Sequence, residues 1–199
     1  TKKFLKNAKI IFTGTPLREQ FYISNDLPSW VPNGTGPLII VMGGSQGANG
    51  VNEMLYKSLD FLLSNNMRVI HIIGDSNAIN IRYKNKRNYL QIKFIEEIAP
   101  LMQNCDLVIA RSGAMTINEL IKNKKPSILV PYPNSKNNHQ EKNAMLLASI
   151  GGSIIINQDP KASFVFKDIL RGIFKLDSEN KKNKYKILEI MKKNMKKIN

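Results

Sequence analysis

The sequence predicts an α/β fold, a Rossmann-like parallel sheet with helices on both faces. Short apolar runs of strand length alternate with longer amphipathic segments along most of the 199 residues, which is the pattern of βαβ units. Two of these runs end directly in small-residue turns, at residues 43–48 and 111–114, and each turn opens into a helical pattern. No apolar run is long enough to span a bilayer, and a chain that is 42% hydrophobic can form one large domain or two small ones.

Lysine and arginine outnumber aspartate and glutamate by 30 to 15, which gives a net charge of +15. Such a charge can attract nucleic acid, acidic lipid head groups or a phosphorylated substrate. It can also be purely compositional, because lysine on solvated helix faces needs no partner. The sequence has no basic patch interleaved with base-stacking aromatic residues, so we do not expect a nucleic-acid partner.

The single cysteine, Cys105, excludes an internal disulfide and fits a reducing, cytoplasmic setting. It lies at the start of a predicted strand, where we expect a buried thiol. The two histidines, His71 and His139, do not form a set of metal ligands with it. We therefore predict neither a metal nor a cofactor.

The first 36 residues contain one short apolar run, at residues 10–14, and then a turn at Pro16. Arg18 follows at once, and a guanidinium just after a strand-end turn can reach the phosphates or the sugar of a ligand. A surface arginine is the simpler interpretation of this turn alone. Residues 19–36 are rich in proline and glycine and predict an irregular connector, with Trp30 as its aromatic anchor.

Residues 37–42 (PLIIVM) are the clearest buried strand, and residues 51–63 predict one amphipathic helix. The glycine-rich turn between them is typical of phosphate-binding sites. Gly43 and Gly44 let the backbone approach a ligand closely, and Ser45 adds a hydroxyl donor. The turn lacks both the Walker and the dinucleotide patterns, and turns of this kind also serve packing alone, so the motif by itself leaves a ligand open.

The next segments predict strands at residues 68–74 and 89–94 and a short helix at 95–102. His71 lies within the first of these strands, where we expect it to be part of the core. Glu96 and Glu97 would occupy the first turn of the helix. Adjacent helical positions point to different faces, which argues against a catalytic pair of acids.

Residues 105–151 contain the most informative pattern. A strand at 106–110, a turn at 111–114, a helix at 116–124 and a strand at 127–130 form a βαβ unit, and ligands of such sheets bind at the carboxyl ends of the strands. A helix start binds anions through its free N–H groups. About one and a half turns further on, Glu119 can accept hydrogen bonds from sugar hydroxyls, and His139 and Gln140 lie in the following loop. The combination suits a nucleotide-sugar.

The C-terminal part predicts a last strand at residues 153–156 and helices at 162–176 and 181–199. The final helix has an apolar stripe surrounded by lysines. Such a helix either packs on a domain, which is commoner, or lies on an anionic membrane surface.

Six motifs, taken together and in order, resemble the carboxyl-terminal half of the MurG family, the bacterial N-acetylglucosaminyltransferases that convert lipid I to lipid II in peptidoglycan synthesis. They are GTPLR at 14–18, GGSQGA at 43–48, FI at 94–95, DLVIARSGAMTINE at 106–119, VPYP at 130–133 and HQEKNA at 139–144. The resemblance covers nearly the whole chain and implies the C-terminal domain of a GT-B glycosyltransferase, which binds UDP-N-acetylglucosamine. The family usually has Asn where this chain has Thr15.

The resemblance also implies roles for individual residues. Arg18 and Ser45 would contact the diphosphate or the sugar, the backbone of Ile95 would meet the uracil, and Glu119 would hold the ribose hydroxyls. Gln140, with His139 beside it, would read the hydroxyls of the sugar. The substrate-binding residues expected are Arg18, Gly44, Ser45, Ile95, Ala114, Met115, Thr116, Ile117, Asn118, Glu119, His139 and Gln140.

The family's amino-terminal half carries a glycine-rich loop and a histidine that this chain lacks. We therefore expect a donor-binding domain at residues 1–176, a basic helix at 177–199 and no catalytic residue in this chain. Lipid I would bind through the missing half, at the cytoplasmic face of the cell membrane, with peripheral contact to the anionic membrane surface. The full enzyme would invert the anomeric centre without a metal, in agreement with the absence of an Asp-x-Asp motif.

Three alternatives stay open from the sequence. The chain could be a non-catalytic nucleotide-sugar-binding subunit of a two-chain transferase, or a GT-B transferase that uses another UDP-sugar. A basic nucleic-acid-binding module, suggested only by the net charge, has no recognition motif to support it.

Overall fold

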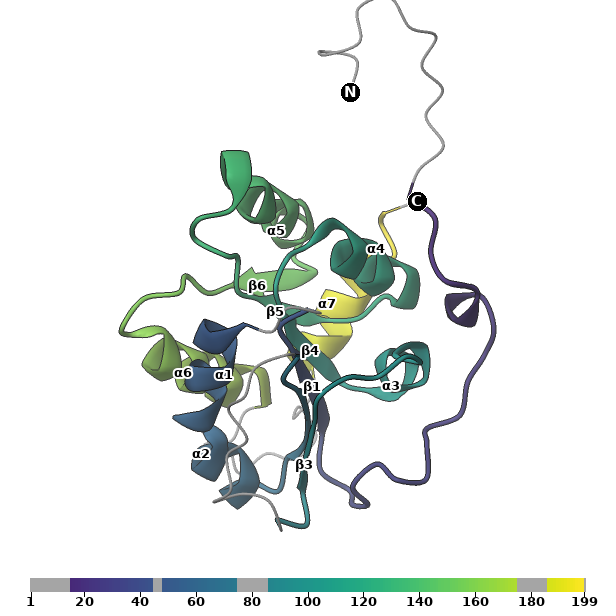
Figure 1. Ribbon diagram of the computed structural model, residues 1–199, viewed down its shortest axis with the longest axis vertical. Helices are drawn as coiled ribbons and strands as arrows, with labels where there is room; N and C mark the ends of the chain where they lie inside the picture. Colours follow the sequence, from purple (N-terminus) through teal and green to yellow (C-terminus); the bar gives the residue numbers. More distant parts are fainter. Residues whose placement is uncertain (1–14, 45–47, 75–85, 175–185, 199) are drawn as a thin grey trace, which may run out of the picture.

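The computed structural model describes residues 15–44, 48–74, 86–174 and 186–198. Its centre is a six-stranded, all-parallel sheet with the strand order β3-β2-β1-β4-β5-β6 (Figure 1). The strands are β1 (Leu38–Met42), β2 (Arg68–Ile72), β3 (Tyr89–Ile92), β4 (Leu107–Ala110), β5 (Ser127–Leu129) and β6 (Ser153–Ile155). The Rossmann-like parallel sheet predicted from the sequence is confirmed.

Helices connect the strands. They are α1 (Asn49–Tyr56), α2 (Leu59–Ser64), α3 (Ala99–Asn104), α4 (Ala114–Asn123), α5 (His139–Ser149), α6 (Ala162–Phe174) and α7 (Lys186–Met195), with short 3-10 turns η1 (Glu19–Phe21) and η3 (Lys136–Asn138). The strand order reverses between β1 and β4, which pair directly with each other, Ile40 opposite Val108. A crevice at the carboxyl ends of the strands is expected at such a reversal.

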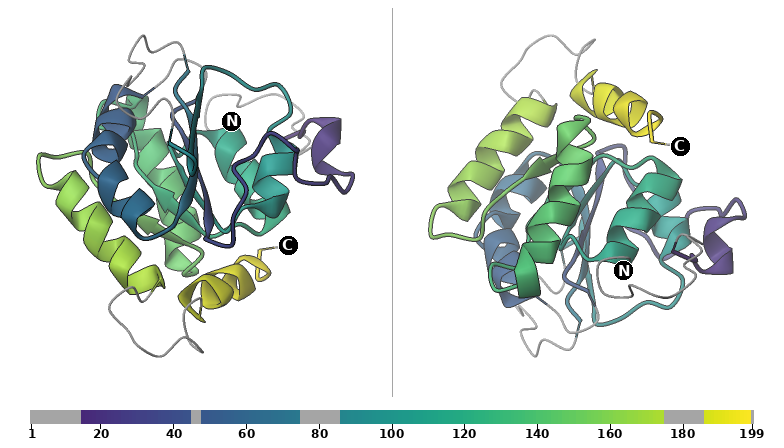
Figure 2. Two further views of the ribbon diagram at one scale, coloured as in Figure 1. Left: turned by 90° about the horizontal axis from the view of Figure 1, so that it is seen from below. Right: turned by 90° about the horizontal axis from the view of Figure 1, so that it is seen from above.

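The sheet is buried on both faces, and the side chains of β1 show why. Ile39 and Val41 pack into one apolar cluster with α1, α2 and α6, whereas Leu38 and Ile40 pack into a second cluster with α3, α4 and α5. Figure 2 shows α1, α2 and α6 on one side of the sheet and α3 and α4 on the other. A run of apolar residues without polar alternation is what such a two-sided strand requires.

Three expectations about local structure are wrong, two about helices and one about Trp30. The helix predicted at 51–63 is two helices, because the hydroxyl of Ser58 donates to the carbonyl oxygen of Met54 (2.9 Å), and α2 starts anew after it. The helix predicted at 95–102 starts only at Ala99, with Pro100 in its first turn, so Glu96 and Glu97 precede it.

Trp30 does not anchor the connector at residues 19–36. Its side chain is 46% exposed, whereas Phe21 of η1 is 2% exposed and packs in the core. The connector is otherwise irregular, as predicted. Cys105 and His71 are both buried, as expected.

The last helix, α7, packs on the domain. Leu188 and Met191 join the cluster beneath α6, and Met195 joins the cluster on the other face of the sheet. Its lysines surround this apolar stripe. Of the two alternatives predicted for this helix, packing on the domain is the one observed. Within the described residues, no helix has the length and apolar character needed to cross a membrane.

Replacing Gly172 by alanine is expected to raise the free energy of unfolding by about 0.5–1 kcal/mol. Gly172 lies within α6 and is exposed, and a Cβ added there would meet nothing within 4 Å. Chemical denaturation measures the change. Gly36→Ala is the opposite case, because a Cβ there would overlap the carbonyl oxygen of Asn66. A Gly172→Ala protein no more stable than the parent would contradict the placement of this residue in a regular helix.

Candidate functional site

Two adjoining clefts, of about 360 and 530 Å³, open where β1 and β4 end. Gly44 and Thr116 line both of them, so the two clefts form one groove over the reversal of strand order. The smaller cleft also has Arg18, Ile95, Met115 and Glu119 in its lining. Gly43 and Gly44 of the first small-residue turn and Gly113 of the second line the larger cleft, so the described parts of the two turns meet at this edge.

The start of α4 points backbone donors at this groove. The first N–H groups of a helix have no carbonyl partner in their own helix, and the N-cap residue Gly113 has no side chain to satisfy them. The preceding residue, Ser112, is fully buried and donates from Oγ to the carbonyl oxygen of Gln140 (2.7 Å), while Asn143 donates to the carbonyl oxygen of Ser112 (3.0 Å). The turn before α4 is thus fixed against α5.

Glu119 lies on the inner side of α4 and is only 6% exposed. Arg18 donates from Nη2 to its Oε1 at 3.2 Å and from Nη1 to the carbonyl oxygen of Glu96 at 2.8 Å. Burial raises the pKa of Glu119 above its ordinary value of 4.5, and the hydrogen bond and charge of Arg18 act in the opposite direction. Arg18 thus lies beside the carboxylate expected at the ribose, 101 residues away in sequence.

The far end of the smaller cleft is apolar. Met42, Ile72 and Ile98 contribute to its lining, together with Phe94 and Ile95, which follow the last residue of β3. Because Ile95 lies beyond the strand, its backbone N–H and C=O groups are outside the sheet ladder. A flat ring could enter here and bond to those backbone groups.

Gln140 lines the larger cleft, where its Oε1 accepts a hydrogen bond from the backbone N–H of Tyr132 (3.0 Å). His139 and Gln140 were expected in a loop, but they open α5 instead. The ring nitrogen Nδ1 of His139 lies 2.7 Å from the carbonyl oxygen of Lys136. Gln140 but not His139 is part of the cleft lining.

Three other expected residues in the described part of the chain do not line either cleft. Ile117 is buried in the core. Asn118 donates to the carbonyl oxygen of Ala114 within α4, and Ala114 itself is exposed at the helix start. Ser45 lies outside the described residues.

Two side chains of the larger cleft were missed from the sequence, Arg111 and Gln158. Arg111 is 8% exposed, and burial lowers its pKa. Arg111 could have been found from its position, because it is a charged residue directly after the strand predicted at 106–110. For Gln158 the sequence offers no comparable signal.

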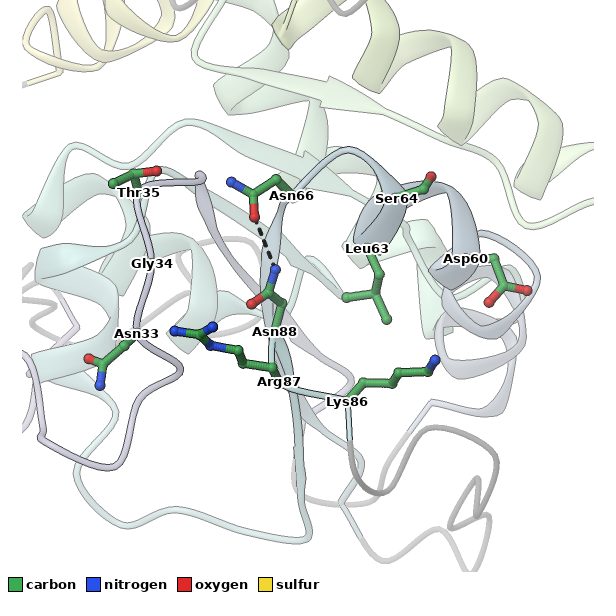
Figure 3. A pocket seen from close by; sticks show the side chains of 10 residues that line it. All are labelled: Asn33, Gly34, Thr35, Asp60, Leu63, Ser64, Asn66, Lys86, Arg87 and Asn88. Atoms are coloured by element: carbon green, nitrogen blue, oxygen red, sulfur yellow. Dashed lines mark hydrogen bonds between the residues drawn. The ribbon is translucent and has the colours of Figure 1, made fainter.

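A larger cavity, of about 750 Å³, lies at the opposite edge of the sheet, before β1, β2 and β3 begin (Figure 3). Most of its lining is exposed, including Asn33, Thr35, Lys86 and Arg87. Figure 3 shows these side chains spread around an open surface, with one hydrogen bond, between Asn88 and Asn66, across it. It lacks the helix start and the buried carboxylate of the groove at the other edge.

Other polar groups have structural roles. His71 contacts the hydroxyl of Tyr89 and the amide oxygen of Asn52, both at 2.9 Å, and burial lowers its pKa to about 3, so it is neutral. Among the described residues there is no group of three or more His, Cys, Asp or Glu placed to hold a metal ion.

A parallel sheet in this order, with a groove at its reversal that joins a free helix start to a buried carboxylate, is typical of doubly wound domains that bind nucleotides. Comparison with known families agrees: residues 38–198 match the model of the glycosyltransferase family 28 C-terminal domain. The chain belongs to this family.

Curated relatives are similar over nearly the whole chain. Two proteins of Prochlorococcus marinus, from strains MIT 9301 and MIT 9515, are 63% and 62% identical over 98% and 100% of this chain. Both are named UDP-N-acetylglucosamine–N-acetylmuramyl-(pentapeptide) pyrophosphoryl-undecaprenol N-acetylglucosamine transferase. The chain spans 54% of the length of each.

Solved structures give the same fold. The crystal structure of Acinetobacter baumannii MurG superposes with a TM-score of 0.68 at 25% identity, covering 82% of this chain and 48% of that one. A glycosyltransferase of kitacinnamycin superposes with a TM-score of 0.60 at 13% identity, covering 96% of this chain and 43% of that one, and at this identity it supports the fold alone.

Proposed function

We propose that this chain is the donor-binding half of an enzyme that transfers N-acetylglucosamine from UDP-N-acetylglucosamine to lipid I, forming lipid II in peptidoglycan synthesis. The observation that carries the proposal is the groove itself, in which the uncapped start of α4 is followed one and a half turns later by the buried Glu119. The names of the relatives supply the donor and the acceptor.

The donor is proposed to lie along the groove in one direction. The uracil enters the apolar end and bonds to the backbone of Ile95, and the ribose hydroxyls donate to the Glu119 carboxylate. The diphosphate lies at the start of α4, at Ala114, Met115 and Thr116, and against the backbone of Gly44. The sugar then reaches the larger cleft and Gln140. Ser45, Ile117, Asn118 and His139 complete the proposed set as neighbours of these groups.

The chemistry proposed for this chain is stabilisation of the leaving group. As the acceptor hydroxyl attacks C1, the bond to the diphosphate breaks and negative charge grows on the departing UDP. N–H groups fixed at a helix start are already oriented toward that charge and need not reorganise. Arg18, which is half-exposed and beside Glu119, can add its charge to the same region.

The remaining length of the relatives is proposed to bind lipid I and to supply the base that activates its hydroxyl. In this division residues 1–176 form the donor domain and 177–199 the basic helix. The boundary lies outside the described residues. We place the enzyme at the cytoplasmic face of the cell membrane as a peripheral protein, where a net charge of +15 would favour anionic lipid. This chain alone is expected to form no lipid II, and lipid II formation by it would contradict the division.

Thermal unfolding with added nucleotides tests the donor site. At about 100 times its dissociation constant, UDP is expected to raise the melting temperature by about 5–10 °C. ADP at the same concentration should raise it much less, because a purine does not fit the backbone groups of Ile95 in the same way. Equal stabilisation by UDP and ADP, or none by either, would contradict a uridine nucleotide site.

The affinity for the donor is expected to fall as the pH is lowered. The midpoint of this fall should lie at a higher pH than the ordinary pKa of a glutamate. The pKa of Glu119 is raised above 4.5, so its carboxylate gains a proton, and loses its acceptor role toward ribose, before an exposed glutamate does. Arg18→Gln removes the influence that lowers this pKa, so its midpoint should lie higher still. Dissociation constants measured from about pH 8 down to about pH 5 give the midpoints. A midpoint lower in Arg18→Gln than in the parent would contradict this.

A further inference from the structure

Three segments converge on the larger cleft through one buried guanidinium. Arg111, directly after β4, donates from Nη1 to the carbonyl oxygens of Val130 (2.9 Å) and Pro131 (3.1 Å). Its Nη2 donates to Oε1 of Gln158, in the loop after β6. The guanidinium also lies over the ring of Tyr132, 5.5 Å from its centroid. Arg111 thus ties the segment that follows β5 to the loop that follows β6.

A buried arginine must find acceptors, because taking its charge out of water costs several kcal/mol. Among the described residues the ion pairs formed are Arg18–Glu119 and Arg171–Asp168, so Arg111 has no carboxylate partner there. Two backbone carbonyl oxygens and the amide oxygen of Gln158 accept the hydrogen bonds of Arg111 in place of a carboxylate. Removing Gln158 therefore leaves the guanidinium with one acceptor fewer and a looser position.

The position of Arg111 matters for Gln140. The backbone N–H of Tyr132 can only donate, so the amide group of Gln140 that faces it must be the oxygen. The NH₂ group of Gln140 is consequently directed away from Tyr132, as a donor to a ligand oxygen. That orientation lasts only while the segment from Val130 to Tyr132 stays where Arg111 holds it.

Gln158 is itself placed by a glycine. It stands over Gly50, in the first turn of α1, where an added Cβ would overlap its amide group. The lack of a side chain at position 50 thus gives Gln158 the room to reach Arg111. The helix after β1 and the turn after β4, on the two sides of the reversal in strand order, are joined in this way.

We propose that Gln158 is a positioning residue for sugar recognition: through Arg111 it fixes the Val130–Tyr132 segment and so holds the Gln140 amide as a hydrogen-bond donor to the sugar. This rests on the proposed function, since it assumes a UDP-sugar in the groove. It adds a residue that touches no uridine group and that selects the sugar half of the donor alone.

The test measures dissociation constants for UDP-N-acetylglucosamine and for UMP, which lacks the sugar, in the parent protein and four variants. Gln158→Leu removes the acceptor. Gly50→Ala leaves the amide intact but displaces it, at little cost because the atoms that must move end a flexible side chain. Gln158→Glu retains an acceptor and is the rescue variant. Gly172→Ala, also a helical glycine but with open space around it, is the control for Gly50→Ala.

Gln158→Leu and Gly50→Ala are each expected to bind UDP-N-acetylglucosamine about tenfold more weakly, with UMP binding within about twofold of the parent. Gln158→Glu and Gly172→Ala should match the parent for both ligands. An equal loss for UMP and for the UDP-sugar, or no loss for either, would overturn the inference. If the parent protein bound UMP but not the UDP-sugar, or bound neither, the proposed function would fail first and the inference with it.

Discussion

Glu119→Gln is expected to weaken the binding of UDP-N-acetylglucosamine by about 10- to 100-fold. The carboxylate offers two charged oxygens to the ribose hydroxyls from a site that is 6% exposed. Glutamine offers one neutral oxygen and brings an NH₂ group. If that group faces Arg18, two donors oppose each other, and if it faces the ribose, it cannot accept from the hydroxyls as the carboxylate does. The fold should survive, because the two side chains have the same shape. Calorimetry gives the dissociation constant.

The matched control is Glu189→Gln. Glu189 is exposed on α7, away from both clefts, and should bind the donor like the parent. An unchanged affinity in Glu119→Gln would contradict the assignment of the ribose to this carboxylate. A similar loss in both variants would point to a general effect of charge instead.

Gly113→Val should weaken donor binding by about 100-fold, the equivalent of one to two lost hydrogen bonds to a charged group. Gly113 is the N-cap of α4 with φ −63° and ψ 152°, which any residue can adopt, and a Cβ there meets no atom within 4 Å. Since Gly113 lines the larger cleft, the added side chain takes the space of the diphosphate. The free energy of unfolding should change by about 1 kcal/mol or less.

Gly113→Val should therefore lose affinity for the donor while its free energy of unfolding stays nearly unchanged. Gly172→Val, equally open but on α6, is the control and should bind the donor normally. If Gly113→Val bound like the parent, the diphosphate would not lie at the start of α4. If Gly113→Val unfolded instead, the result would contradict the structure, in which a side chain at position 113 meets no neighbouring atom.

The strands could be predicted closely from the sequence, and the reason is physical. A strand of a parallel sheet is buried on both faces, so the predicted strands at 37–42 and 106–110 are apolar throughout except for Asp106. They become β1 and β4, each starting one residue later. The helix boundaries were less predictable. A single hydroxyl, that of Ser58, divides the helix expected at 51–63, and such a bond leaves no mark in the hydrophobic pattern.

The groove could be predicted in part. The turn at 111–114 and Glu119 lie in one short segment, so their spacing along a helix fixes their geometry. Arg18 and Glu119 are 101 residues apart, and Arg111 and Gln158 are 47 apart, so only the order of the strands in the sheet brings each pair together. That order cannot be obtained from the periodicity of one sequence.

Calorimetric titration of this chain with UDP-N-acetylglucosamine, UDP-glucose and UMP tests the central claim most directly. A donor site built from α4, Glu119 and Gln140 predicts saturable binding of all three, tightest for the N-acetyl sugar. Equal affinities for the two UDP-sugars would leave a uridine nucleotide site but contradict N-acetylglucosamine as its selected sugar. No saturable heat with any of the three would contradict the claim that this half of the enzyme holds the donor.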